Sequence, residues 1–499
     1  MKHFLYLSLL MFLSSCSRSS RLDEALEYAG ANRQELEKVL AHYQDCGVKL
    51  EAARFLIEHM PGKYGIEARN DNDGYKQFLK NIPQEDSVSW RTDSSLVSLM
   101  LDSVSGRVIP QRHREDDITS VCADFLIRHI DSAFNVWQTS KFCRHYSFED
   151  FCHYILPYRM GNEPLSDWME MGNRRYRHLL DSALTPKEIA VRIALDEGMR
   201  YNIGMGKYPY PQSFEEMMCS RWGTCEEMAL FLSLALRSIG IPSTVDFVPA
   251  WANRSAGHCW NVVKDTCGRF VEVGYGDEGV NSVVYKVSKI YRREYAVGKK
   301  ADVTAEYGMP QTDLTFHLKE DMKNRPISLC TFNNHTWTPV AFALADGKEV
   351  MFSSVGRGTL WGENEILPYQ DEGKGLVYLP VKSDDRNPVA NPVILYEDGS
   401  QRLLSADVAR TEKITLYRKY PFYLTNSSDI YDSNNVCPGD TYELFYWDDE
   451  WKGLGRQTAE SDSLIYDSVP CGALLWLHNY TRGKEERIFT YENGKQIWW

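Results

Sequence analysis

The 499-residue sequence lacks several features that mark common classes of protein. It has no basic run, and its net charge is −13 at pH 7, so we expect no nucleic-acid partner. No apolar run beyond Phe4–Leu13 approaches the length of a membrane-spanning helix. The chain also lacks the closely spaced cysteine pairs and histidine pairs of zinc sites. It therefore gives no indication of a metal or of an organic cofactor.

The N-terminus has the composition of a secretory signal. Met-Lys-His precedes the apolar run Phe4–Leu13, which is too short to span a membrane as a mature helix. The run ends in Leu13-Ser-Ser-Cys16, which resembles a bacterial lipobox, whose cysteine is lipidated and becomes the first mature residue. We therefore expect residues 1–16 to be a lipoprotein signal peptide, with Cys16 as the lipid attachment site. An ordinary signal peptide that happens to end in cysteine is the alternative.

The residues after Cys16 bear on where such a lipoprotein is delivered. Ser17 stands where inner-membrane lipoproteins of enterobacteria have aspartate, and no acidic run follows to resemble the surface-export signal of Bacteroidetes. We therefore expect an outer-membrane lipoprotein that faces the periplasm, with surface exposure as the alternative. The membrane contact would be the N-terminal lipid anchor.

Cys225 lies in the segment Trp-Gly-Thr-Cys-Glu-Glu-Met-Ala, which has the pattern of a helix start. Thr224 is a suitable N-cap residue, and Glu227 three positions later completes a capping box. The apolar run Met228–Leu236 predicts that the helix is buried. This places Cys225 in the first turn.

The first turn of a helix favours a thiolate, because unpaired N–H groups and the helix dipole stabilise negative charge. The same N–H groups can form an oxyanion hole. Glu226 and Glu227 act in the opposite direction, because nearby negative charge raises the pKa of a thiol. We therefore expect that Cys225 needs an imidazolium partner.

Three strands are predicted after this helix, over 243–250, 258–264 and 269–275. Alternation along the second strand puts His258 and Trp260 on one face, and Cys259 and Asn261 on the other. The layout of a thiol at a helix start and an imidazole on a neighbouring strand is the one that a cysteine nucleophile requires.

These residues resemble the transglutaminase-like superfamily of papain-type cysteine enzymes. That family has Gly-x-Cys at a helix start and His-x-Trp on a following strand, here Gly223-Thr-Cys225 and His258-Cys-Trp260. An acid at the end of the next strand orients the histidine in the family. The resemblance covers roughly residues 190–280.

The acidic member of the family pattern is displaced in this chain. The family aspartate falls near Gly274, which cannot orient an imidazole, while Glu272 and Asp277 lie close by. The resemblance implies that at most one of these two carboxylates orients His258. A missing acid weakens the case for catalysis without abolishing it, because the acid chiefly fixes the tautomer and orientation of the base.

The resemblance implies an enzyme that acts on amide bonds, by hydrolysis or acyl transfer, through Cys225 and His258. Its substrate would be a peptide, a protein or a glycopeptide. The alternative is a catalytically inactive transglutaminase-like lipoprotein that binds a glycan or a protein. A zinc site is a weak third interpretation, because its candidate ligands lack zinc-site spacing. Those candidates are Cys219, Cys225, His258, Cys259 and Cys267.

We divide the chain after the signal peptide into four parts. We predict an α-helical region over 21–189, an α+β transglutaminase-like domain over 190–300, and antiparallel β-sandwich modules over 301–410 and 411–499. In the helical region, Asn32 and Glu35 predict a capping box, and the run from Ile118 to Trp137 predicts one helix.

Turn signals support the β-modules. Asp346-Gly347, Asp398-Gly399 and Asn493-Gly494 each predict a hairpin. The similar stretches Tyr396–Gln401 and Tyr491–Gln496 indicate either two related β-domains or one favoured turn. The chain ends in Trp498-Trp499, which predicts a docked last strand.

Overall fold

The computed structural model describes residues 21–68, 73–82, 90–105, 110–273, 285–359, 372–421, 434–482 and 486–499. Cys16 and Asp277 lie outside these residues. The chain forms two compact units. Unit 1 comprises Met1–Asp246, Cys259–Asp277 and Arg292–Ala301, and unit 2 comprises Phe247–His258, Glu278–Tyr291 and Asp302–Trp499.

The first part of unit 1 is a helical region, as predicted. Its helices bury one apolar face each; in α7, for example, Leu126, Ile130, Ala133 and Phe134 are buried at helical spacing. The helices are α2 (Arg33–His42), α3 (Val48–Glu58), α4 (Asp73–Asn81), α5 (Trp90–Ser105), α6 (Asp117–Ser120), α7 (Ala123–Thr139), α8 (Phe148–Tyr154) and α9 (Trp168–Tyr176), with an antiparallel ladder of β1 (Tyr64–Ala68) and β2 (Arg112–Asp116).

Two local predictions in this region are wrong. Asn32 makes no capping bond to α2, because its backbone is helical rather than extended; its Nδ2 donates to the carbonyls of Ile118 and Val121, at 3.2 and 3.0 Å. Glu35 likewise accepts from the N–H of Ala123 at 2.9 Å rather than from the N-cap. The predicted helix from Ile118 is interrupted where Val121 adopts an extended conformation, which separates α6 from α7. Long-range partners have replaced the local bonds in both cases.

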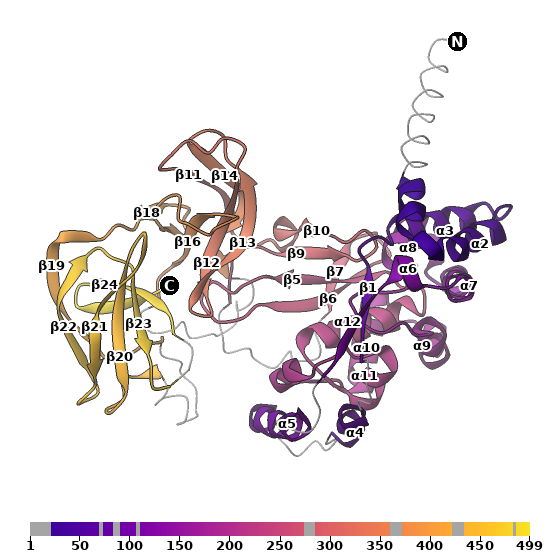
Figure 1. The fold of residues 1–499 in the computed structure, drawn as a ribbon, viewed down its shortest axis with the longest axis horizontal. Coiled ribbons are helices and arrows are strands. Elements are labelled where there is room, and N and C mark those ends of the chain that lie inside the picture. The colour runs from indigo at the N-terminus through magenta and orange to yellow at the C-terminus, as the bar shows by residue number, and fades with distance from the viewer. Residues whose placement is uncertain are drawn as a thin grey trace, which may run out of the picture. The chain divides into compact units, whose positions relative to one another are not determined.

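The second part of unit 1 carries the predicted α+β arrangement. The helices α10 (Pro186–Glu197), α11 (Phe214–Ser220) and α12 (Cys225–Arg237) accompany a five-stranded sheet of order β10-β9-β5-β6-β7 (Figure 1). The strands are β5 (Ser243–Val248), β6 (His258–Lys264), β7 (Phe270–Val273), β9 (Tyr291–Glu294) and β10 (Lys299–Asp302). The predicted helix at Cys225 and the three strands after it are confirmed.

A buried ion pair fixes the middle of this sheet. Arg292 on β9 donates from Nε and Nη2 to the two carboxylate oxygens of Asp246 on β5, at 2.9 and 2.8 Å. Asp246 is fully buried, and the guanidinium also lies 4.2 Å from the ring centroid of Phe270 on β7. Three strands are thereby joined through one guanidinium group.

Among the residues that the structure describes, unit 2 contains two modules of seven strands each, with the same strand order. In the first, a sheet of order β13-β12-β16-β17-β18 accompanies the pair β11-β14, and in the second a sheet of order β21-β20-β23-β24-β25 accompanies the pair β19-β22 (Figure 1). If the strands of each module are numbered from its own first strand, the larger sheet has the order 3-2-5-6-7 in both modules, and strands 1 and 4 form the pair. The first module's strands are β11 (Gln311–His317), β12 (Pro326–Asn333), β13 (Thr336–Leu344), β14 (Glu349–Gly356), β16 (Gly375–Lys382), β17 (Val393–Tyr396) and β18 (Gln401–Leu403).

The second module's strands are β19 (Asp407–Leu416), β20 (Thr441–Asp448), β21 (Glu450–Thr458), β22 (Leu464–Cys471), β23 (Leu475–Asn479), β24 (Ile488–Glu492) and β25 (Lys495–Trp498). Each module buries apolar side chains from both of its sheets in one core, which makes it a sandwich. A short ladder of β8 (Lys286–Val287) with β15 (Gly358–Thr359) accompanies the first module. The predicted C-terminal antiparallel β-modules are confirmed.

The repeated stretches identified in the sequence occupy equivalent turns. Tyr396–Gln401 joins β17 to β18, and Tyr491–Gln496 joins β24 to β25, which are the last two strands of each module. The common strand order favours two related domains over one favoured turn. Trp498 and Trp499 are 1% and 4% exposed, so the predicted docking of the last strand is confirmed.

Aromatic side chains fill the contact between the two modules. A single buried cluster contains Phe332 and Trp337 from the first module and Trp447 from the second, with Trp451 and Trp476 packed against it. The rings of Trp337 and Trp447 lie 5.3 Å apart and those of Phe332 and Trp476 lie 5.6 Å apart. Aromatic residues make up 12% of the chain, and these five serve as core between the modules.

Candidate functional site

Cys225 is the first residue of α12, as predicted from its flanking residues. The Thr224 side chain accepts from the Glu227 N–H at 3.4 Å, and the Glu227 carboxylate accepts from the Thr224 N–H at 2.9 Å. This reciprocal pair is the predicted capping box. It fixes the helix start and leaves the thiol of Cys225 half-buried at the N-terminal end, where N–H groups and the helix dipole favour negative charge.

The backbone before Cys225 is held by a short parallel ladder. The strand β4 (Trp222–Gly223) pairs with β3 (Arg200–Tyr201), and the N–H of Asn202 donates to the Gly223 carbonyl at 2.9 Å. Gln212 Nε2 donates to both the Trp222 carbonyl and the Glu227 carboxylate, each at 3.0 Å. A side chain at Gly223 would bring its Cβ to 2.9 Å from the Cβ of Glu227, so the packing favours glycine.

The two acidic residues after Cys225 have partners that limit their effect on the thiol. Glu226 forms an ion pair with Arg293 of β9. Glu227 is held by Thr224 and Gln212, and burial raises the pKa of its carboxyl group. The expected opposition of these carboxylates to a Cys225 thiolate is therefore weaker than their sequence positions indicate.

A second thiol, that of Cys259, lies next to Cys225, whereas the sequence pattern offered Cys259 only as a weak zinc-ligand candidate. The side chain of Cys259 on β6 interacts with Cys225, and it is only 6% exposed. That interaction, followed by burial, raises the pKa of the Cys259 thiol, so Cys259 keeps its proton. The protonated thiol can then donate to a Cys225 thiolate.

The neighbouring contacts on β6 explain this placement. Asn261 Nδ2 donates to the Ala229 carbonyl and to Ser233 Oγ of α12, at 2.7 and 2.8 Å. Cys259 and Asn261 therefore share the face of β6 that packs on α12, as alternation predicted for the pair. The alternation, combined with the buried helix, was the signal that could have identified Cys259.

His258 is the first residue of β6. Its half-buried ring stacks on Trp251, with centroids 6.2 Å apart, and Trp251 in turn lies 4.5 Å from the ring of Tyr285. The preceding residue is Gly257, where a Cβ would lie 2.4 Å from the Val248 carbonyl oxygen. The close backbone approach at Gly257 thus positions His258 within unit 2. The pairing of His258 with Cys225 stays a prediction.

The two candidate acids differ in what the structure describes. Glu272 lies on β7, opposite Val262 of β6, and is half-buried. Asp277 falls outside the described residues, so the choice between the two carboxylates stays open as a prediction. Of the weak zinc candidates, Cys219 and Cys267 are both exposed, whereas Cys259 is buried against Cys225. No disulfide joins any of the cysteines within the described ranges.

A cavity of about 240 Å³ lies in unit 1, and Arg293 in its lining forms an ion pair with Glu226 at the start of α12. Its lining includes Lys63, Arg159, Tyr295 and Lys299. Burial lowers the pKa of Lys63 to about 8, and its Nζ donates to the Tyr295 carbonyl at 2.6 Å. The lining also includes Glu294, and two of its basic residues already have acidic partners, Arg159 with Asp117 and Arg293 with Glu226.

Comparison with known proteins identifies the domain. Residues 176–274 match the model of the transglutaminase-like superfamily. The red sea bream transglutaminase is a similar solved structure, 10% identical, with 86% of this chain and 76% of that chain covered and a TM-score of 0.15. At that TM-score the assignment rests on the family match. No curated protein matches the chain. Within the described residues, no helix has the length and apolar character needed to cross a membrane.

Proposed function

Because residues 176–274 form a domain of the transglutaminase-like superfamily, we propose that this protein is a cysteine enzyme of the cell envelope that acts on amide bonds. Cys225 is the proposed nucleophile and His258 the proposed base, with Glu272 or Asp277 as its orienting acid. The substrate is a peptide, a protein or a glycopeptide.

The proposed reaction has two steps. The Cys225 thiolate adds to an amide carbonyl, and His258, which carries the thiol proton, protonates the departing amine as the C–N bond breaks. Water or a second amine then attacks the acyl-enzyme, loses its proton to His258 and releases Cys225. Attack by water gives hydrolysis, and attack by an amine gives acyl transfer. N–H groups at the start of α12 can stabilise the oxyanion in both steps.

The observation that carries this proposal is the position of Cys225 at a capped helix start inside the matched domain. Two further features support it: Glu226 is neutralised by Arg293, and Cys259 offers a hydrogen bond to the nucleophile.

Removing the nucleophile tests the reaction. We propose to incubate the full chain with a protein digest, with and without glycopeptides and an added primary amine, and to follow cleaved and amine-modified peptides by mass spectrometry. Cys225→Ser should lower turnover by about three orders of magnitude or more, because the hydroxyl is a far weaker nucleophile. Cys267→Ser is the matched control, since Cys267 is an exposed thiol of the same domain.

The result also separates enzyme from binding protein. Equal turnover by Cys225→Ser and Cys267→Ser would contradict the assignment of Cys225. Absence of turnover in the wild type, together with retention of peptides or glycopeptides on the immobilised protein, would support the inactive binding lipoprotein instead.

We propose further that Cys16 carries a lipid that anchors the protein in the outer membrane, facing the periplasm or the exterior. The support is the sequence Leu13-Ser-Ser-Cys16 after an apolar run. Cys16→Ala should abolish metabolic labelling with palmitate and release the protein from the membrane fraction. A variant that still labels and still sediments with outer membranes would refute the lipobox interpretation.

A further inference from the structure

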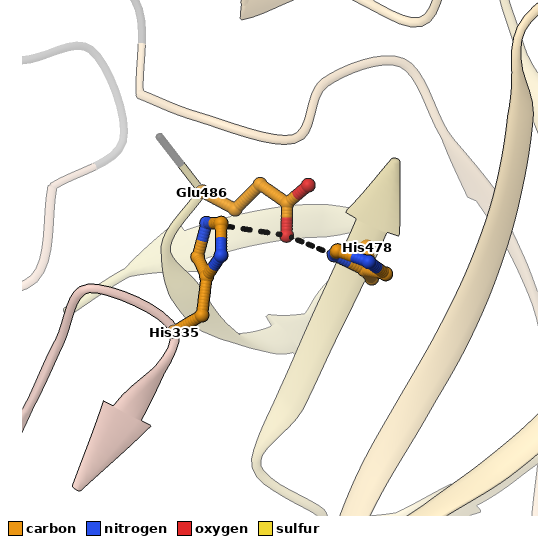
Figure 2. A group of neighbouring side chains, drawn as sticks. All are labelled: His335, His478 and Glu486. Carbon is orange, nitrogen blue, oxygen red and sulfur yellow. Dashed lines mark hydrogen bonds and ion pairs between the residues drawn. The ribbon is translucent and has the colours of Figure 1, made fainter. Parts of the chain in front are cut away.

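Two histidines and one glutamate converge at the contact between the two β-modules. His335 comes from the turn between β12 and β13 of the first module, whereas His478 on β23 and Glu486 just before β24 belong to the second (Figure 2). One potential ligand atom from each residue lies within 4.8 Å of the other two. His335 is far in the sequence from His478 and Glu486, so no local spacing signalled a site shared by all three.

The distances between the ligand atoms suit a small divalent cation. His478 Nδ1 lies 2.9 Å and His335 Nε2 lies 3.8 Å from Glu486 Oε2. In a tetrahedral zinc site with bonds of about 2.0–2.2 Å, ligand atoms stand roughly 3.3–3.6 Å apart. The two observed distances fall on either side of that value, so small movements of the two rings would complete the geometry.

The Glu486 carboxylate is held as a metal-binding carboxylate usually is. Its side chain is fully buried, Oε2 accepts from Trp476 Nε1 at 2.8 Å, and Oε1 accepts from the Asn479 N–H at 2.7 Å. Hydrogen bonds of this kind, made to a metal ligand by neighbouring groups, fix the orientation of the ligand and tune the affinity for the metal. The histidine side chains are 35% and 25% exposed, which leaves a path for an ion to enter.

His335 is placed in a way that the surrounding hydrogen bonds do not explain. At 3.8 Å its Nε2 is too far from Glu486 for a hydrogen bond, yet the ring points toward the carboxylate (Figure 2). Its φ of 60°, like the 48° of Asn334, belongs to the two-residue hairpin turn between β12 and β13. The ring also packs 5.8 Å from that of Trp476, which already bonds the carboxylate.

We propose that His335, His478 and Glu486 form a zinc-type metal site that joins the two β-modules. Two imidazoles and one carboxylate are a donor set that zinc accepts, and three protein ligands leave a fourth position for water. The ion would replace the hydrogen bond between His478 and Glu486 and neutralise the buried carboxylate. The site is independent of Cys225 and adds a binding function to the modules.

Metal binding by the tag-free full chain tests the proposal. After removal of metal with a chelator, the wild type should take up one equivalent of Zn²⁺ that His335→Gln and His478→Gln each bind at least about 100-fold more weakly. His317→Gln is the matched control, because His317 also faces a glutamate, Glu349 at 3.1 Å, but is 84% exposed. Zinc should raise the melting temperature of the wild type and the control, and not that of the two site variants.

The remaining outcomes decide against the site. The chain has other cysteines that could bind zinc, so Co²⁺ absorption spectra should show imidazole and carboxylate ligation without thiolate bands. Near-UV circular dichroism checks that the variants fold. Equal zinc binding by the wild type and both folded site variants, or no histidine-dependent equivalent in the wild type, overturns the proposal.

Discussion

Replacing Cys259 tests how the candidate nucleophile is held. Cys259 is buried, and its interaction with Cys225 raises the pKa of the Cys259 thiol. Cys259→Val removes the S–H donor and keeps an apolar side chain of similar size, whereas Cys259→Ser keeps a donor. If the Cys259 thiol stabilises a Cys225 thiolate, the valine variant should raise the pKa of Cys225 and the serine variant should not.

The size of the effect follows from the strength of the lost bond. A hydrogen bond to a charged group contributes about 1.5–3 kcal/mol. Because a thiol is a weak donor, we expect a loss near the lower limit, about 1.4 kcal/mol, which equals about one pKa unit. At low pH the thiolate fraction then falls about tenfold, while the more basic thiolate becomes roughly threefold more reactive. The valine variant should therefore react about threefold more slowly below the pKa and about threefold faster above it.

Iodoacetamide labelling as a function of pH measures this directly. Tryptic cleavage after Arg221 and Arg237 isolates Cys225 from every other cysteine, so mass spectrometry can follow its modification alone. The rate profiles of the wild type and Cys259→Val should cross, and that of Cys259→Ser should stay with the wild type. Superimposable profiles for the wild type and a folded Cys259→Val would refute the role assigned to Cys259.

Three further predictions concern stability. Asp246→Asn removes the charge that pairs with buried Arg292 and should lower the free energy of unfolding by about 3–5 kcal/mol in urea titrations; a loss below about 1 kcal/mol would argue against the pair's importance. Gly257→Ala places a Cβ 2.4 Å from the Val248 carbonyl oxygen and should lower the melting temperature by several degrees, and an unchanged value would contradict that close approach. Burial lowers the pKa of His129 to about 4, so as the pH falls from about 6.5 toward 4 the unfolded chain binds a proton that the folded chain excludes, and about 3 kcal/mol of stability should be lost. His129→Gln should flatten that pH dependence, and an unaltered slope would count against it.

Local sequence patterns predicted the elements that position the candidate site. The capping box at Thr224 and Glu227 and the apolar run after it sufficed for α12, because all of its determinants lie within one segment. Alternation likewise gave β6 and the shared face of Cys259 and Asn261. The repeated turns pointed to related β-modules, and the common strand order supports that interpretation.

Features that depend on contacts distant in sequence escaped the patterns. Asn32 has the residue type of an N-cap, yet it bonds carbonyls near the start of α7 instead. The neutralisation of Glu226 by Arg293 depends on the position of β9 beside β5, which no local signal fixes. The grouping of His335 with His478 and Glu486 requires two separate modules to meet. The predicted domain boundaries stay predictions. The segments 247–258 and 278–291 lie inside the predicted range 190–300 but group with the β-modules in unit 2.

The most direct test of the central claim is the pH dependence of Cys225 alkylation with and without His258. An ordinary thiol with a pKa of about 8.5 is almost wholly protonated at pH 6, whereas a thiolate paired with an imidazolium reacts there readily. We predict substantial labelling of Cys225 at pH 6 in the wild type, and a shift of the profile to higher pH in His258→Ala. Identical profiles in the two proteins, both centred near pH 8.5, would contradict the assignment of Cys225 and His258 as the catalytic pair.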